Sequence, residues 1–218
     1  VVKEVVSRRA DGAEIDWNEV HDCEEVEQYD PDVVLQVVDS MDLDESLVFT
    51  PQLIDMHRRL LLAFVKYDLL LETGHSLDMR SLEKQMGVLA RTVNPLTGDG
   101  IDELAAKVVH AAEGRVEVLR HVHVDYGQDV MHAVKRIVDF LVHHSSLITH
   151  HSKRYLAIRL LERPVETLPF FKDEPWYEDL VALVERERKH LFVELKRPPE
   201  EIIHEARHGY VSGALAAA

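Results

Sequence analysis

The chain has little of what disulfide-linked or polyanion-binding proteins need. Its only cysteine is Cys23, so no internal disulfide can form, and the sequence fits a reducing compartment. Only 25 basic residues stand against 40 acidic ones, which gives a net charge of -15. A surface of this sign repels nucleic acids and anionic lipids, so we expect no nucleic-acid partner.

Long apolar runs are also missing. The best candidate, Leu60–Leu71, is interrupted by Lys66 and Asp68 and falls short of the roughly 20 residues that a membrane-spanning helix needs. The valines at the start are interrupted by charged residues such as Lys3 and Glu4, which is unlike a signal peptide. With 46% hydrophobic and 30% charged residues, the composition is that of a soluble globular protein.

What the first half does contain is a repeated strand and helix pattern. Nearly continuous apolar residues over Val33–Val38 and Leu60–Val65 are typical of strands buried on both faces of a parallel sheet. Between them, Asp44–His57 has helical spacing, and Pro51 must kink or restart that helix. Val88–Val93 is predicted as the third strand. This order predicts a parallel α/β sheet layered by helices.

The remaining segments complete two expected domains, residues 1–115 and 116–218. Asp11-Gly12 predicts a hairpin within Val1–Trp17, and Asp78 is the expected N-cap of a helix ending at Met86. The helix Gly100–Glu113 should present one apolar face, formed by Ile101, Leu104, Ala105, Val108 and Val109. The second domain should be all-helical, with helices over Val130–Val142, Lys153–Leu161, Trp176–Leu195 and Pro199–Leu215.

Polar residues follow two of the predicted strands. Lys66 and Asp68 come after the second strand, and Asn94, Pro95 and Leu96 after the third; ligands bind at such strand ends. Guanine presents an N1–H beside an amino group, and one carboxylate can accept both. Asp68 could be that carboxylate, with the Lys66 stem along the base and backbone groups of 94–96 closing over it. The alternative is that Lys66 and Asp68 are only a polar strand exit and helix cap.

Several segments in matching order resemble one protein family. Lys66-Tyr67-Asp68 stands where a G domain has Asn-Lys-x-Asp, and Val37–Leu53 is similar to V-V-D-A-x-N-L-E-R-N-L-x-L-T-x-Q-L. Thr97–Leu104 is similar to T-G-E-G-I-D-E-L, and Glu205–Leu215 to E-A-R-Y-G-F-I-x-G-A-L. These patterns are those of the ferrous iron transport protein B family, and the resemblance covers about residues 30–215.

The resemblance implies a P-loop-NTPase-like G domain followed by a helical domain like a guanine-nucleotide-dissociation inhibitor. It implies binding of GTP or GDP with Mg²⁺, slow GTP hydrolysis, and coupling to Fe²⁺ transport. The expected partner is an attached or associated transmembrane iron permease, and the expected location is the cytoplasmic face of the inner membrane. Homo-oligomerisation stays open.

The chain also departs from the family pattern. No G-x-x-x-x-G-K-[ST] phosphate loop occurs in its 218 residues, and without that loop hydrolysis is not possible. Val65 replaces the asparagine of the base motif, and Asn94-Pro95 replaces a small hydroxyl residue and alanine. Of the D-x-P-G motif only Asp16 remains. A nucleotide-free pseudo-G-domain interaction module is therefore an alternative.

Fourteen histidines raise a further alternative, a histidine-based metal-sensing domain. The candidate pairs are His121 with His123, His204 with His208, and His143-His144 with His150-His151. Two imidazoles without a nearby carboxylate or thiolate set are usually surface residues, so we assign no metal ligand.

Overall fold

The structure is a computed structural model that describes residues 31–115, 122–144 and 152–218. Two compact units make up the chain, Val1–Val122 with Val211–Ala218, and His123–Tyr210. The predicted hairpin within Val1–Trp17 lies outside the described residues. None of the described helices is long and apolar enough to cross a membrane.

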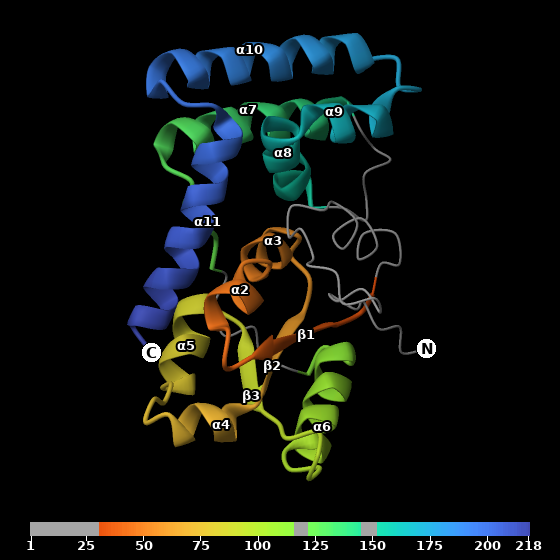
Figure 1. Ribbon diagram of the computed structural model, residues 1–218. Helices are drawn as coiled ribbons and strands as arrows, with labels where there is room; N and C mark the ends of the chain where they lie inside the picture. The colour runs from red at the N-terminus through yellow and green to blue at the C-terminus, as the bar shows by residue number, and fades with distance from the viewer. Residues whose placement is uncertain (1–30, 116–121, 145–151) are drawn as a thin grey trace, which may run out of the picture. The chain divides into compact units, whose positions relative to one another are not determined.

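A parallel sheet forms the centre of the first unit (Figure 1). Its strands pair in the order β1 (Val34–Asp39), β2 (Leu60–Val65) and β3 (Leu89–Thr92). The register aligns Asp39 with Val65 and Phe64 with Thr92. The carboxyl ends of all three strands therefore meet at one edge, as the sequence predicts.

Burial differs between the strands. In β2, Leu60–Phe64 are all buried, as predicted. For β1 the prediction of burial on both faces is wrong, because Leu35 is 42% and Val37 60% exposed. Both residues pair in register with the α6-facing β2 residues Leu61 and Ala63. Since β1 is the outermost strand of the described sheet, the α6 cluster that covers β2 and β3 does not include its side chains.

Helices lie on both sides of this sheet, with α6 on one side and α2, α3 and α5 on the other (Figure 1). Their bounds are α2 (Leu43–Leu47), α3 (Thr50–Asp55), α4 (Tyr67–Glu72), α5 (Met79–Met86) and α6 (Ile101–Ala112). Pro51 restarts the chain as α3 in its first turn, as predicted. The sequence did not predict α4, which is less than two turns long.

The apolar face of α6 is narrower than predicted. Leu104 and Ala111 are buried and Val108 packs beside them, which is the i, i+4, i+7 line of a helix. Ile101 and Val109 belong to the neighbouring line and are exposed. The prediction combined two neighbouring rows of apolar residues on α6, and only the row of Leu104 packs against the sheet.

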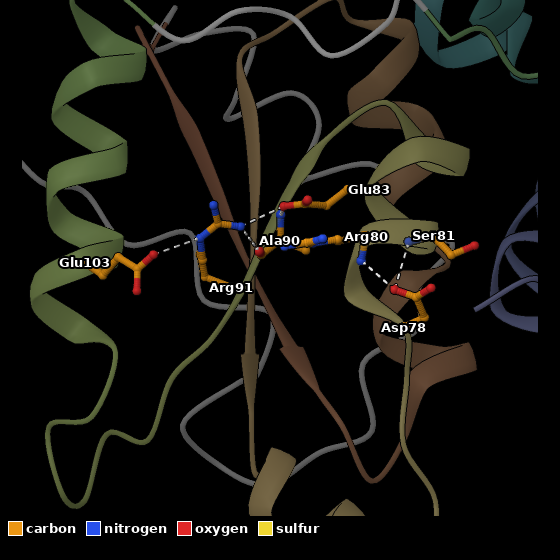
Figure 2. A network of polar contacts seen from close by, with 7 residues as sticks. All are labelled: Asp78, Arg80, Ser81, Glu83, Ala90, Arg91 and Glu103. Carbon is orange, nitrogen blue, oxygen red and sulfur yellow. Dashed lines mark hydrogen bonds and ion pairs between the residues drawn. The ribbon is translucent and has the colours of Figure 1, made fainter.

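Arg91 joins elements on both sides of the sheet at β3, as Figure 2 shows. Its Nη1 lies 2.7 Å from Glu83 Oε1 on α5, and its Nε lies 3.4 Å from Glu103 Oε1 on α6. Glu83 Oε1 also accepts from Ala90 N at 2.9 Å, so a side chain satisfies a backbone donor of this outer strand. Asp78 caps α5 by accepting from the backbone N–H groups of residues 80 and 81.

The second unit is helical, as predicted. It contains α7 (Gln128–His144), α8 (Lys153–Glu162), α9 (Pro164–Thr167), the 3₁₀ helix η1 (Leu168–Phe171), α10 (Tyr177–Leu195) and α11 (Pro199–Ala216), whose last residues from Val211 group with the first unit. The short α9 and η1 were not predicted. Residues 155–161 of α8 are all buried, which makes α8 the central helix of this unit.

Arg207 and Glu187 are two of the charged residues that the helical unit buries together with partners. Arg207 Nη1 lies 2.7 Å from Glu162 Oε1, and its Nε donates to the Tyr126 hydroxyl at 3.2 Å. Glu187, with 4% of its side chain exposed, accepts from Arg136. Such pairs cost desolvation, so removing one partner destabilises a fold more than the intact pair stabilises it.

Candidate functional site

The candidate site lies at the carboxyl edge of the sheet, where side chains from three strand ends meet. Asp39 is the last residue of β1, and Lys66 follows β2. Lys66 Nζ forms an ion pair with Asp39 Oδ2. Lys66 also has a left-handed backbone with φ of 56°, a conformation that costs a non-glycine residue on the order of 1 kcal/mol. The α4 helix begins directly after this residue, at Tyr67.

Asp68 and Asn94 are brought together, as the sequence predicts. Asp68 lies exposed in the first turn of α4, and Asn94 comes two residues after β3. Asn94 Nδ2 donates to Asp68 Oδ2 at 3.1 Å. Within the described part of the chain, Asp68 Oδ1 has no hydrogen-bond partner. The carboxylate is thus fixed by one neighbour and open to further donors.

The loop after Asn94 closes on itself. Asn94 Oδ1 accepts from Leu96 N at 2.9 Å and Thr97 N at 3.2 Å, while the Asn94 carbonyl accepts from Gly98 N at 2.8 Å. Asn94 N donates to the Asp99 carbonyl at 2.9 Å. Asn94 is therefore the hub of the loop as well as its link to Asp68.

Pro95 and Leu96 are the remaining predicted site residues, and the structure places both in this loop. Pro95 is exposed and Leu96 is 96% exposed. Pro95 has no backbone N–H, and the Leu96 N–H is already bonded to Asn94. No described contact joins either side chain to Lys66 or Asp68.

Two residues of the site escaped the sequence analysis. Asp39 is the ion-pair partner of Lys66. The sequence could have indicated this pair, because parallel pairing aligns the ends of the first two strands. Tyr67 lies between Lys66 and Asp68, and its hydroxyl bonds the N–H and the carbonyl of Leu77, both at 3.0 Å. A tyrosine at this position anchors the start of α4 to the segment before α5, which periodicity could not indicate.

Where the structure describes them, the histidine pairs do not belong to a larger group of metal-binding side chains. His204 and His208 have ring centroids 4.4 Å apart, and His143 and His144 each bond a backbone carbonyl of their own helix. In residues 31–115, 122–144 and 152–218 there is no group of three or more metal-binding side chains. His121, His150 and His151 lie outside those ranges.

The His204 imidazole has a lowered pKa. Burial is the largest cause, and the nearby His208 and Arg207 also lower the pKa, while Glu162 raises it. More than a third of the His204 side chain is nevertheless exposed, so the effect of its titration on stability is screened by solvent.

Chemically, the strand-end site offers a fixed acceptor beside a cation. The Asp68 carboxylate can accept two parallel N–H groups, and the paired Lys66 lies next to it in the chain. A planar base with two adjacent donors, such as guanine, fits this acceptor, whereas adenine presents a ring-nitrogen acceptor that the carboxylate would repel.

Comparisons with known proteins find similar sequences over most of the chain. Residues 14–108 match the family model "Ferrous iron transport protein B", and residues 126–218 match "FeoB cytosolic helical domain". A curated Fe(2+) transport protein A/Fe(2+) transporter FeoB fusion protein of Porphyromonas gingivalis is 30% identical over 195 residues. That match covers 87% of this chain but only 23% of the relative, so the chain spans about a quarter of its length.

Solved structures share the fold. The cytosolic domain of the T. maritima FeoB iron transporter in apo form has a TM-score of 0.70 at 23% identity, covering 92% of this chain and 73% of that one. An S. thermophilus NFeoB mutant bound to GMPPNP has a TM-score of 0.77 at 20% identity, covering 89% and 73%. With a G-domain model and a helical-domain model of one family matched in order, the chain belongs to the ferrous iron transport protein B family.

Proposed function

We propose that this chain is the guanine-nucleotide-binding and helical regulatory region of a ferrous iron transporter. Asp68 accepts the N1–H and the 2-amino group of guanine, and Lys66 lies along the base. The observation that carries this proposal is the exposed Asp68 carboxylate at a strand end, held by Asn94 at 3.1 Å. Its position agrees with ligand binding at the carboxyl ends of parallel strands.

The preformed geometry supports base binding in particular. Asn94 fixes the carboxylate before a ligand arrives, so little side-chain entropy is lost on binding. The Lys66–Asp39 pair holds the lysine against the first strand end. Both links depend only on residues of the described sheet edge.

The wider proposal concerns Fe²⁺ transport and GTP hydrolysis. Membership of the family and the fusion relative support a role in Fe²⁺ transport at the cytoplasmic face of a membrane, with a permease as partner. Magnesium and the phosphates would be held by groups other than Lys66, Asp68 and Asn94, which in this proposal serve the base. In the nucleotide-bound state, changes in the G domain would be passed to the helical domain.

Asp68→Ala and Asp68→Asn test the base-reading role. With the full chain, calorimetric titration of GDP, GTP and ATP in Mg²⁺ should show guanine selectivity that Asp68→Ala removes. Loss of a charge-assisted pair of hydrogen bonds should weaken GDP binding by roughly 10- to 100-fold. Asp68→Asn should shift preference toward xanthine nucleotides, because an amide can donate to their 2-oxo group.

Asp102→Ala is the matched control, since it removes one exposed carboxylate from the first turn of α6. It should leave GDP affinity unchanged. Equal GDP affinity in Asp68→Ala and wild type would refute the assignment. Absence of binding by every nucleotide would refute nucleotide binding by this chain and favour the interaction-module alternative.

A further inference from the structure

In the loop from Asn94 to Asp99, the backbone N–H groups donate to acceptors of the loop itself. Asn94 N, Gly98 N and Asp99 N donate to the Asp99 carbonyl, the Asn94 carbonyl and Thr97 Oγ1, respectively. Leu96 N and Thr97 N both donate to Asn94 Oδ1. Pro95 has no N–H. Between residues 94 and 99, every backbone N–H that exists already has an acceptor inside the loop.

The side chains of Thr97, Lys66 and Asn94 each donate to an acceptor as well. Thr97 Oγ1 donates to Asp99 Oδ2 at 2.6 Å, and Lys66 Nζ pairs with Asp39. Asn94 Nδ2 uses one N–H on Asp68. Its second N–H diverges from the first in the amide plane.

We propose that this site reads guanine along its N1–H and 2-amino edge alone and leaves the 6-position unread. This inference rests on the proposed function, since it needs Asp68 to bind the base. Pro95 and Asn94 are the specificity-determining residues: Pro95 removes one donor from the loop, and Asn94 occupies two more. The ligand class is purine nucleotides with an N1–H and a 2-amino group, whatever atom stands at C6.

The nature of the excluded ligands follows from the same geometry. Adenine nucleotides stay excluded because their N1 is an acceptor facing the Asp68 carboxylate. Inosine nucleotides keep N1–H and the 6-oxo group but lose the amino group, so they lose one of the two hydrogen bonds to Asp68. A nucleotide of 6-thioguanine keeps both hydrogen bonds and changes only the unread atom.

Competition against a fluorescent GDP analogue on the full chain, with GDP, 6-thio-GDP and IDP as competitors, tests this selectivity. We expect 6-thio-GDP to bind within about twofold of GDP, and IDP to bind roughly tenfold more weakly, as for one lost hydrogen bond to a charged group. Pro95→Ala adds one N–H with no acceptor in the loop. It should favour GDP over 6-thio-GDP by roughly three- to tenfold.

A wild-type preference for GDP over 6-thio-GDP of tenfold or more would overturn the inference. If Asn94→Ser abolished that preference, the reader of the 6-position would be the Asn94 amide. If GDP does not bind, or binds Asp68→Ala equally well, the proposed function itself fails and the inference falls with it. These results differ, so the two failures can be told apart.

Hydrogen exchange tests the closed loop without any nucleotide. The amides of Leu96 and Thr97 should exchange slowly in the full chain and become fast in Asn94→Ala, because that variant removes their shared acceptor. Exchange of both amides in wild type at the rate of an unstructured peptide would overturn the closed loop and the inference together.

Discussion

The Glu187 carboxylate offers a sharp test of how the helical unit is held together. Only 4% of its side chain is exposed, and Arg136 Nε and Nη2 both donate to its Oε2, at 2.8 and 2.6 Å. Arg186 Nη2 lies 3.2 Å from Oε1, but 69% of the Arg186 side chain is exposed. Arg136→Leu therefore leaves a buried carboxylate with one weak partner.

The expected cost is about 3 kcal/mol, the lower end of the range for breaking a buried pair, because Arg186 remains. Replacing both Arg136 and Glu187 by leucine should recover most of that loss, since no buried charge is left unpaired. The stability lost in Arg136→Leu therefore measures the cost of burying the Glu187 carboxylate without Arg136, rather than the net contribution of the ion pair.

Urea unfolding followed by Trp176 fluorescence is the assay. Trp176 is buried in the core of the helical unit, and a Trp17→Phe background removes the other tryptophan. At an m-value of about 1–2 kcal/mol/M, the midpoint should fall by about 1.5–3 M. Arg197→Leu breaks the exposed Arg197–Glu205 pair and should leave the midpoint unchanged. A midpoint for Arg136→Leu equal to that of the control, or a double variant no better than the single one, would refute the reasoning.

Two further predictions concern a glycine and a histidine. Gly100→Ala should destabilise the first unit by more than about 2 kcal/mol, because φ is +77° and a Cβ would lie 2.5 Å from the Thr92 carbonyl oxygen. Gly98→Ala is the control, since Gly98 has a similar φ of +88° but open space around it. A urea midpoint for Gly100→Ala that is no lower than the midpoint for Gly98→Ala would contradict the clash. The pKa of His204 should lie below the ordinary value for histidine, and His208→Ala should raise it while burial keeps it depressed. Because the folded pKa is the lower one, the contribution of this group to stability is lost as pH falls below the unfolded value, about 6.5, through the folded pKa. An NMR titration in which His204 titrates at or above the ordinary value, or is unmoved by His208→Ala, would contradict this.

The sequence predicted most of the fold because the signals were local. Continuous apolar residues located the strand Leu60–Val65 to the residue. The proline at 51 predicted a kinked or restarted helix, and the structure shows the restart. The errors arose where burial depends on distant elements. Nothing within Val33–Val38 indicates that β1 lies outermost in the described sheet, and nothing within α6 distinguishes the line of Leu104 from that of Val109. Short helices such as α4 hold too few residues for periodicity to appear.

The candidate site was predictable in its residues but not in its hydrogen bonds. Strand-end positions and the family resemblance indicated Lys66, Asp68 and Asn94, and the structure brings Asp68 and Asn94 together. The closed loop depends on which acceptor each N–H finds, and a sequence does not give that. Asn94 could have faced solvent with the same spacing.

The apolar side chain of Val65 explains why other residues must hold the site together. A valine has no polar group with which to brace the base motif, so the bracing must come from elsewhere. In this chain two other links supply it: Lys66 to Asp39 on one side, and Asn94 to Asp68 on the other. Both join neighbouring strand ends of one sheet, so the proposed base site is held by contacts within this sheet edge. The same Asn94 that holds Asp68 also accepts from the Leu96 and Thr97 amides. The loop therefore has no free backbone donor to offer to the proposed base.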